Sequence, residues 1–117
     1  MMVVEDDVAS RNALVMLLSR VGFETWHAGT VAEAMQLLSR GPTAVILDLM
    51  LPDGNGASVL EHVRRAGLAM RVAVATGAGD WKSLVDEARL KPDAVFLKPI
   101  DFPKLVRWLD EPCAPKN

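Results

Sequence analysis

Residues 44–48 read Ala44-Val45-Ile46-Leu47-Asp48, four apolar residues followed by a carboxylate. An uninterrupted apolar run of this length is typical of a strand buried on both faces, as in a parallel sheet covered by helices. Similar runs occupy residues 2–4, 72–75 and 94–97, and each predicts a further strand of this kind. Residues 25–28 form a more mixed run, which predicts a strand near the edge of the sheet.

Helical periodicity fills the intervals between these runs. Gly22 would end a first helix, and Thr30 with Glu33 forms a capping box that begins a second, which Gly41-Pro42 would end. Asp80 and Asp101 can cap the last two helices, with Pro103 tolerated in the first turn of the final one. The apolar residues predicted to form the buried helix faces are Leu14, Leu17, Leu18, Val21, Val31, Ala34, Met35, Leu38, Val59, Leu60, Val63, Leu84, Val85, Ala88, Leu105, Val106 and Leu109. Strands alternating with helices predict an α/β fold, a doubly wound five-stranded parallel sheet with helices on both faces.

Length and composition exclude several classes of protein. The 117 residues, 50% hydrophobic and 24% charged, fit one globular domain over residues 1–110 and a tail or start of a linker over 111–117. A net charge of −2 predicts no binding to nucleic acid or to an anionic membrane. The lone Cys113 favours a reducing compartment. The acidic residues near the N-terminus do not fit a signal peptide, and no apolar stretch is long enough to span a membrane, so we expect a cytoplasmic protein.

Polar residues follow four of the predicted strands. Glu5-Asp6-Asp7 follows the first, Asp48 the third, Thr76 the fourth and Lys98 the fifth. Doubly wound sheets place their sites at these carboxyl ends, so we expect the side chains to converge. Grouped carboxylates repel one another unless a cation lies among them, and hard oxygen ligands favour Mg²⁺, which usually shares a phosphate oxygen. A carboxylate in such a setting can form an aspartyl phosphate, and Asp48 is the candidate nucleophile because the acids after the first strand are better placed as metal ligands.

The same residues form a set of motifs in a definite order. They are Val3-Val4-Glu5-Asp6-Asp7, Asp48-Leu49-Met50-Leu51-Pro52-Asp53-Gly54-Asn55-Gly56, Thr76, and Lys98-Pro99. From Met2 to about Leu109, the chain resembles the receiver domain of bacterial two-component response regulators. The resemblance implies that Asp48 is phosphorylated by a histidine kinase or a histidine phosphotransfer protein.

The resemblance also implies a set of metal ligands. Mg²⁺ would be bound by Asp6, by Asp48 and by the backbone carbonyl of Met50, with Glu5 helping through a water molecule. Asp7 falls where the family varies and is given no role. The domain would catalyse only its own phosphoryl transfer and dephosphorylation, and would not be an enzyme for metabolites.

Other positions would bind the phosphoryl group and shape the loops. Lys98 would pair with Asp48 and then with the phosphoryl group, and Thr76 would move in to bond a phosphoryl oxygen. Pro52 and Gly56 would shape the loop after the third strand, and Pro99 would follow a cis peptide bond. Phosphorylation adds roughly −1.5 to −2 charges at Asp48, which would switch the surface of the fourth helix, fifth strand and fifth helix. An unknown downstream protein would bind that surface, and a homodimer could form on phosphorylation.

Two features depart from the family pattern. Val95 stands where many receivers carry Tyr or Phe, and Phe96 should point to the opposite side of its strand. Met50 and Ala78 offer no group to hold an attacking water molecule, which favours slower loss of the phosphoryl group.

Other interpretations of the sequence stay open. One alternative is a phosphatase of the haloacid dehalogenase type. Such an enzyme needs a second Asp two residues after the nucleophile, and Met50 at that position counts against it. A receiver-like module that binds proteins without being phosphorylated usually lacks one of the acidic residues or the lysine, all of which are present. His27, His62 and Arg64-Arg65 are interpreted as ordinary strand or solvated helix residues. Trp81 and Trp108 are either partly buried or anchors for a partner.

Overall fold

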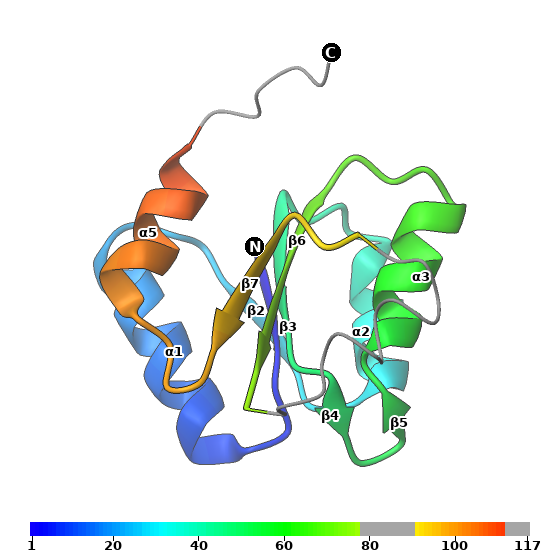
Figure 1. The fold of residues 1–117 in the computed structure, drawn as a ribbon, viewed down its shortest axis with the longest axis horizontal. Coiled ribbons are helices and arrows are strands. Elements are labelled where there is room, and N and C mark those ends of the chain that lie inside the picture. Colours follow the sequence, from blue (N-terminus) through cyan, green and yellow to red (C-terminus); the bar gives the residue numbers. More distant parts are fainter. Residues whose placement is uncertain (78–90, 112–117) are drawn as a thin grey trace.

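The structure, a computed structural model, describes residues 1–77 and 91–111. Five parallel strands form one sheet in the order β2-β1-β3-β6-β7. The strands are β1 (Met2–Val4), β2 (Trp26–Ala28), β3 (Ala44–Leu47), β6 (Arg71–Thr76) and β7 (Ala94–Leu97). Figure 1 shows helices on both faces of this sheet, which confirms the doubly wound α/β fold.

Four described helices cover the sheet. On one face lie α1 (Val8–Arg20) and α5 (Phe102–Asp110), and on the other lie α2 (Val31–Leu38) and α3 (Ala57–Arg65) (Figure 1). The predicted helix at Leu84, Val85 and Ala88, with Asp80 as its cap, lies outside the described residues. The same is true of Ala78, Trp81, Cys113 and residues 112–117 of the predicted tail.

The sheet separates two apolar cores because alternate side chains of a strand point to opposite faces. Val45 and Leu47 of β3 pack with α2 and α3, whereas Ile46 packs on the side of α1 and α5. Each of these three side chains is at most 2% exposed. The apolar run that predicted a strand buried on both faces is thus confirmed at β3.

The helix ends follow the capping rules. Thr30 accepts a hydrogen bond from the Glu33 amide over 3.1 Å, and Asp101 accepts one from the Lys104 amide over 3.2 Å, as predicted. Asp7 caps α1 by accepting a bond from the Ser10 amide over 2.9 Å, a contact that was not predicted. Between α1 and β2, Gly22 has φ +95°, a conformation that glycine adopts without strain.

Some of the expected burial was wrong. Leu17 and Val21 of the first helical segment are 38% and 49% exposed, because Leu17 lines a groove and Val21 follows the last turn of α1. β7 was expected to be buried on both faces, but among the described strands it pairs with β6 alone and its Leu97 is 60% exposed. β2 occupies the other edge, as its mixed composition predicted.

Arg64 and Arg65 differ in their surroundings. Arg65 is exposed and pairs with Glu61, one turn earlier in α3. Arg64 is not simply solvated, as had been expected, because it forms an ion pair with Asp93 over 3.2 Å and donates a hydrogen bond to the Lys91 carbonyl. It therefore joins α3 to the segment that precedes β7.

The C-terminal end of α5 is held against the sheet by side-chain contacts. Trp108 is partly buried, and its ring lies edge to face with Phe96 at 6.2 Å between centroids. The guanidinium of Arg71 lies 4.1 Å from the centre of the Trp108 ring and donates to the carbonyls of Trp108 and Glu111. Phe96 points to this face and Val95 to the other, as the strand alternation predicted.

Candidate functional site

Two buried carboxylates follow neighbouring strands of the sheet. Glu5 comes directly after β1 and Asp48 directly after β3, and both continue the strand ladder by one backbone hydrogen bond each. The Glu5 amide donates to the Ala28 carbonyl over 2.9 Å, and the Asp48 amide donates to the Val4 carbonyl over 3.0 Å. The sheet itself therefore sets the positions of these two residues, which are 7% and 6% exposed.

Asp6 completes a cluster of three carboxylates. One oxygen from each of Glu5, Asp6 and Asp48 lies within 4.8 Å of the others, and Asp6 is the exposed member. Three hard oxygen donors at this spacing, with an open side, fit the ligands that Mg²⁺ takes in proteins. Of the acidic residues that the sequence predicted to converge, Glu5, Asp6 and Asp48 are thus brought together, whereas Asp7 caps α1.

Lys98 reaches this cluster from the end of β7. Its ammonium nitrogen lies 2.7 Å from Oε2 of Glu5 and 2.9 Å from Oδ2 of Asp48. The pairing with Asp48 was expected, whereas the shorter contact with Glu5 was not. The Lys98 amide also donates to the Thr76 carbonyl over 3.0 Å, which fixes the start of the side chain.

Burial and neighbouring charges shift the pKa values of Glu5 and Lys98. Burial raises the pKa of Glu5 above its usual value, and the nearby Asp48 raises it further, while Lys98 opposes the rise. Burial alone would lower the pKa of Lys98, but its hydrogen bonds to Glu5 and Asp48 outweigh this and raise it. The three carboxylates together with one lysine leave a net negative site that attracts a cation.

Each oxygen of Asp48 has a hydrogen-bond donor. The Met50 amide donates to Oδ1 over 3.0 Å, and Lys98 donates to Oδ2. Met50 begins a small antiparallel hairpin of β4 (Met50–Leu51) and β5 (Gly54–Asn55), which the sequence had predicted only as a loop. Main-chain groups of this hairpin thus help to orient the Asp48 carboxylate.

Gly56 directly follows the hairpin and is hydrogen-bonded to Leu49, the residue that directly precedes the hairpin. Its amide donates to the Leu49 carbonyl over 2.9 Å, and a Cβ atom at this position would lie 2.0 Å from the Asp48 carbonyl oxygen. No side chain fits so close an approach of two backbones. The predicted role of Gly56 in shaping this loop therefore has a direct steric basis, and Pro52 lies in the turn between β4 and β5.

Thr76 and Pro99 also lie at this end of the sheet. Thr76 is the last residue of β6, fully buried, on the strand between β3 and β7. The Lys98–Pro99 peptide bond is cis, as the resemblance implied.

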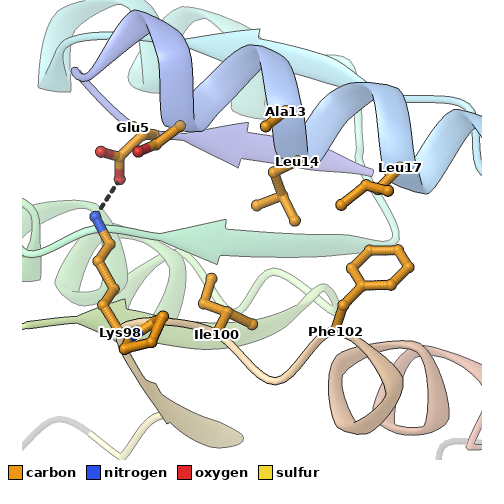
Figure 2. A pocket seen from close by; sticks show the side chains of 9 residues that line it. Glu5, Ala13, Leu14, Leu17, Lys98, Ile100 and Phe102 are labelled. Atoms are coloured by element: carbon orange, nitrogen blue, oxygen red, sulfur yellow. Dashed lines mark hydrogen bonds and ion pairs between the residues drawn. The ribbon is translucent and has the colours of Figure 1, made fainter.

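An apolar groove opens beside the carboxylates. Its volume is about 560 Å³, and Figure 2 shows Leu14 and Leu17 of α1 facing Ile100 and Phe102 across it. Glu5 and Lys98 also line it, joined by their ion pair. The groove therefore lies between α1 and residues 99–102 and reaches the charged cluster.

Asp53 is a site residue that sequence reasoning did not single out. It lies in the turn of the β4–β5 hairpin and accepts hydrogen bonds from the amides of Val31 and Ala32 at the start of α2. These partners are more than 20 residues away along the chain, so no local pattern predicts the contact.

Comparisons with known proteins identify the family of the chain. The sequence profile of the response regulator receiver domain matches residues 1–110. The chain is 33% identical over 106 residues to a probable transcriptional regulatory protein, SilR, of Salmonella typhimurium, covering 90% of this chain and 46% of that protein. It is 31% identical over 102 residues to the photosynthetic apparatus regulatory protein RegA of Rhodobacter capsulatus, covering 86% and 55%. The chain thus spans about half the length of these two relatives.

Solved structures show the same fold. The response regulator protein TrrA of Thermotoga maritima, solved in complex with Mg²⁺ and BeF, has a TM-score of 0.80 and 25% sequence identity, over 92% of this chain and 93% of that one. The signal receiver domain of a LuxO repressor protein from Vibrio parahaemolyticus has a TM-score of 0.79 at 25% identity, over 92% and 84%. Within the described part of the chain, no helix is long and apolar enough to cross a membrane. From its matched residues, its sheet order and its acidic cluster, the chain belongs to the response regulator receiver domains of two-component systems.

Proposed function

We propose that Asp48 accepts a phosphoryl group from a phosphohistidine on a histidine kinase or a histidine phosphotransfer protein. A carboxylate oxygen of Asp48 would attack phosphorus, the bond from phosphorus to the imidazole nitrogen would break, and the histidine would leave with the electron pair. The observation that carries this proposal is the pairing of Asp48 with Lys98 inside a cluster of three carboxylates. Such a site holds both a nucleophile and a cation for the phosphoryl oxygens.

The proposed metal is Mg²⁺, which would neutralise charge on the transferring phosphoryl group. Asp6, Asp48 and the backbone carbonyl of Met50 would hold it, with Glu5 contributing through a water molecule. The three carboxylates support this assignment by their spacing and by the oxygen donors that they offer. The similar TrrA structure was solved with Mg²⁺ and BeF, which supports the same proposal.

Lys98 and Thr76 would bind the phosphoryl oxygens after transfer. Lys98 already donates to Asp48, and Thr76 lies at the end of the strand between Asp48 and Lys98 in the sheet. New charge at Asp48 would draw these two residues inward and bias the surface around β7 and α5 toward a partner-binding form. Val95 packs into the core and offers no aromatic side chain, so Thr76 and Lys98 would have to carry the response.

The phosphodonor protein would approach through the groove between α1 and the segment 99–102. Its apolar lining begins at the Glu5–Lys98 pair, so a helix seated there would bring a phosphohistidine close to Asp48. The downstream partner, a homodimer on phosphorylation and the cytoplasmic location stay predictions from the sequence.

Intact mass spectrometry tests the phosphorylation proposal. The protein is incubated with acetyl phosphate, with and without Mg²⁺, alongside D48A and the matched surface variant D110N. We expect the gain of one phosphoryl group in the wild type and in D110N, only with Mg²⁺, and no gain in D48A. If folded wild-type protein gains no mass from acetyl phosphate or from a phosphorylated histidine phosphotransfer protein, the unphosphorylated binding module replaces this proposal.

A further inference from the structure

The side chain of Asp53 joins the β4–β5 hairpin to α2 by accepting two hydrogen bonds. Oδ1 of Asp53 lies 2.8 Å from the Val31 amide nitrogen, and Oδ2 lies 3.2 Å from that of Ala32. These are the first two amides of α2, which have no partners within the helix. The bond from the Val31 amide lowers the pKa of Asp53, so the carboxylate is ionised at neutral pH and favoured by the helix dipole.

The helix does not depend on Asp53 alone for its cap. Thr30 accepts a hydrogen bond from the Glu33 amide at the same end of α2. Thr30 belongs to the segment that leads into α2, whereas Asp53 comes from a different part of the chain. The distinctive effect of Asp53 is therefore to connect the hairpin to the helix.

The other end of the hairpin bonds directly to Asp48. The Met50 amide donates to Oδ1 of Asp48, and Met50 is held in register opposite Asn55. Oδ1 of Asn55 in turn accepts a hydrogen bond from the Ala57 amide at the start of α3 over 2.9 Å. The hairpin is thus held between the first turns of α2 and α3, with Asp48 at its base.

We infer that Asp53 is a positioning residue for chemistry at Asp48, acting through the hairpin to hold the Met50 main chain in place. This inference rests on the proposed function, because the Met50 carbonyl is one of the proposed Mg²⁺ ligands and the Met50 amide orients the Asp48 carboxylate. Residues that orient metal ligands affect metal affinity without touching the metal. Asp53 itself contacts neither Asp48 nor the other two carboxylates of the cluster in the contacts that the structure describes.

The test compares D53A with T30A, its matched control. Both variants remove a hydrogen-bond acceptor from the start of α2, but only D53A removes the hydrogen bonds between the hairpin and α2. We expect D53A to weaken Mg²⁺ binding about tenfold in a calorimetric titration with MgCl₂ and to slow phosphorylation by acetyl phosphate at limiting Mg²⁺. D53N, which keeps one acceptor oxygen, should recover part of both effects, and T30A should change neither.

Hydrogen exchange at the Met50 amide gives a readout that needs neither metal nor phosphodonor. It should quicken in D53A and remain unchanged in T30A, when the two are compared under conditions of equal global stability. If D53A and T30A have equal Mg²⁺ affinity and equal Met50 exchange, Asp53 is only a helix cap and the inference is overturned. If the wild type takes up no phosphoryl group, the proposed function fails separately, and Met50 exchange still decides whether Asp53 positions the hairpin.

Discussion

The ammonium nitrogen of Lys98 lies 2.7 Å from Oε2 of Glu5, a residue 93 positions earlier in the chain. The same nitrogen lies 2.9 Å from Asp48, so one lysine holds the carboxylates that follow two adjacent strands. The contact joins the ends of β1 and β7, the first and last of the described strands, at the carboxyl edge of the sheet. It makes Lys98 a structural residue as well as a proposed ligand of the phosphoryl group.

Lys98→Met should lower stability in the absence of Mg²⁺. Two buried carboxylates would lose their shared cation, which we expect to cost about 1–3 kcal/mol at neutral pH, after allowing for the partial exposure of Lys98. Urea unfolding measures the loss, and Mg²⁺ should restore part of it. Lys104→Met, an exposed position of α5, is the control. Equal stability of the K98M and K104M proteins would contradict this account.

Gly56→Ala should be strongly destabilising. The new Cβ would lie 2.0 Å from the Asp48 carbonyl oxygen and 3.0 Å from the Leu49 Cα, so the backbone must shift, at an expected cost of about 3 kcal/mol or more. Gly77→Ala is the control, because among the described residues its Cβ would meet the Lys98 Cβ alone, at an ordinary 3.8 Å. Thermal or urea unfolding of the two variants gives the comparison, and a small effect at position 56 would show that the hairpin can move away from Asp48.

Asp53→Asn should lose stability in a pH-dependent way. The hydrogen bond from the Val31 amide holds the pKa of Asp53 below its ordinary 3.8. A depressed pKa means that the stabilisation is fully present above pH 3.8 and is lost as the pH falls through the lower, folded-state value. Urea unfolding of the wild type and D53N, from neutral pH into the acid range below pH 3.8, measures the difference in their free energies of unfolding. This difference should be largest at neutral pH and should shrink as the pH falls. A difference that stayed constant would mean that the charge of Asp53 does not contribute.

Arg71→Met should loosen the far end of α5. It removes the hydrogen bonds to the Trp108 and Glu111 carbonyls and the contact with the Trp108 ring, at an expected cost of about 1–2 kcal/mol. Arg71→Lys keeps the charge but not the planar fork, so it should recover only part of the loss. Urea unfolding followed by tryptophan fluorescence measures both variants, and full recovery by lysine would assign the effect to charge alone.

Most of the sheet could be predicted because a strand buried on both faces has an uninterrupted run of apolar residues. The runs at β1, β3 and β7 have the observed bounds, and every residue of β1 and β3 is buried. β7 shows the limit of that rule. Its apolar run resembles that of a central strand, although among the described strands it pairs with β6 alone. The sequence of a strand does not indicate how many strands pair with it.

The convergence of the site was predictable, but its internal contacts were not. Topology alone brings Glu5, Asp48 and Lys98 to one edge of a parallel sheet. The bond between Lys98 and Glu5 depends on which way a long side chain turns, and the bonds of Asp53 depend on where a short hairpin meets α2. Arg64 was misjudged for the same reason, because its partner Asp93 lies 29 residues further along the chain.

The acidic cluster also decides where the molecule carries its net charge. The chain has 15 acidic and 13 basic side chains. The site holds three of the acidic ones, Glu5, Asp6 and Asp48, and one of the basic ones, Lys98. Twelve side chains of each sign therefore lie elsewhere. By formal charge, the remainder of the chain sums to zero, and the net charge of −2 equals that of these four residues at one end of the sheet. At distances beyond the Debye length of about 8 Å such a field is screened in physiological salt, so it acts on ions that are already near the surface. In dilute buffer it would reach further, drawing divalent cations toward Asp48 and slowing the approach of small anionic phosphodonors.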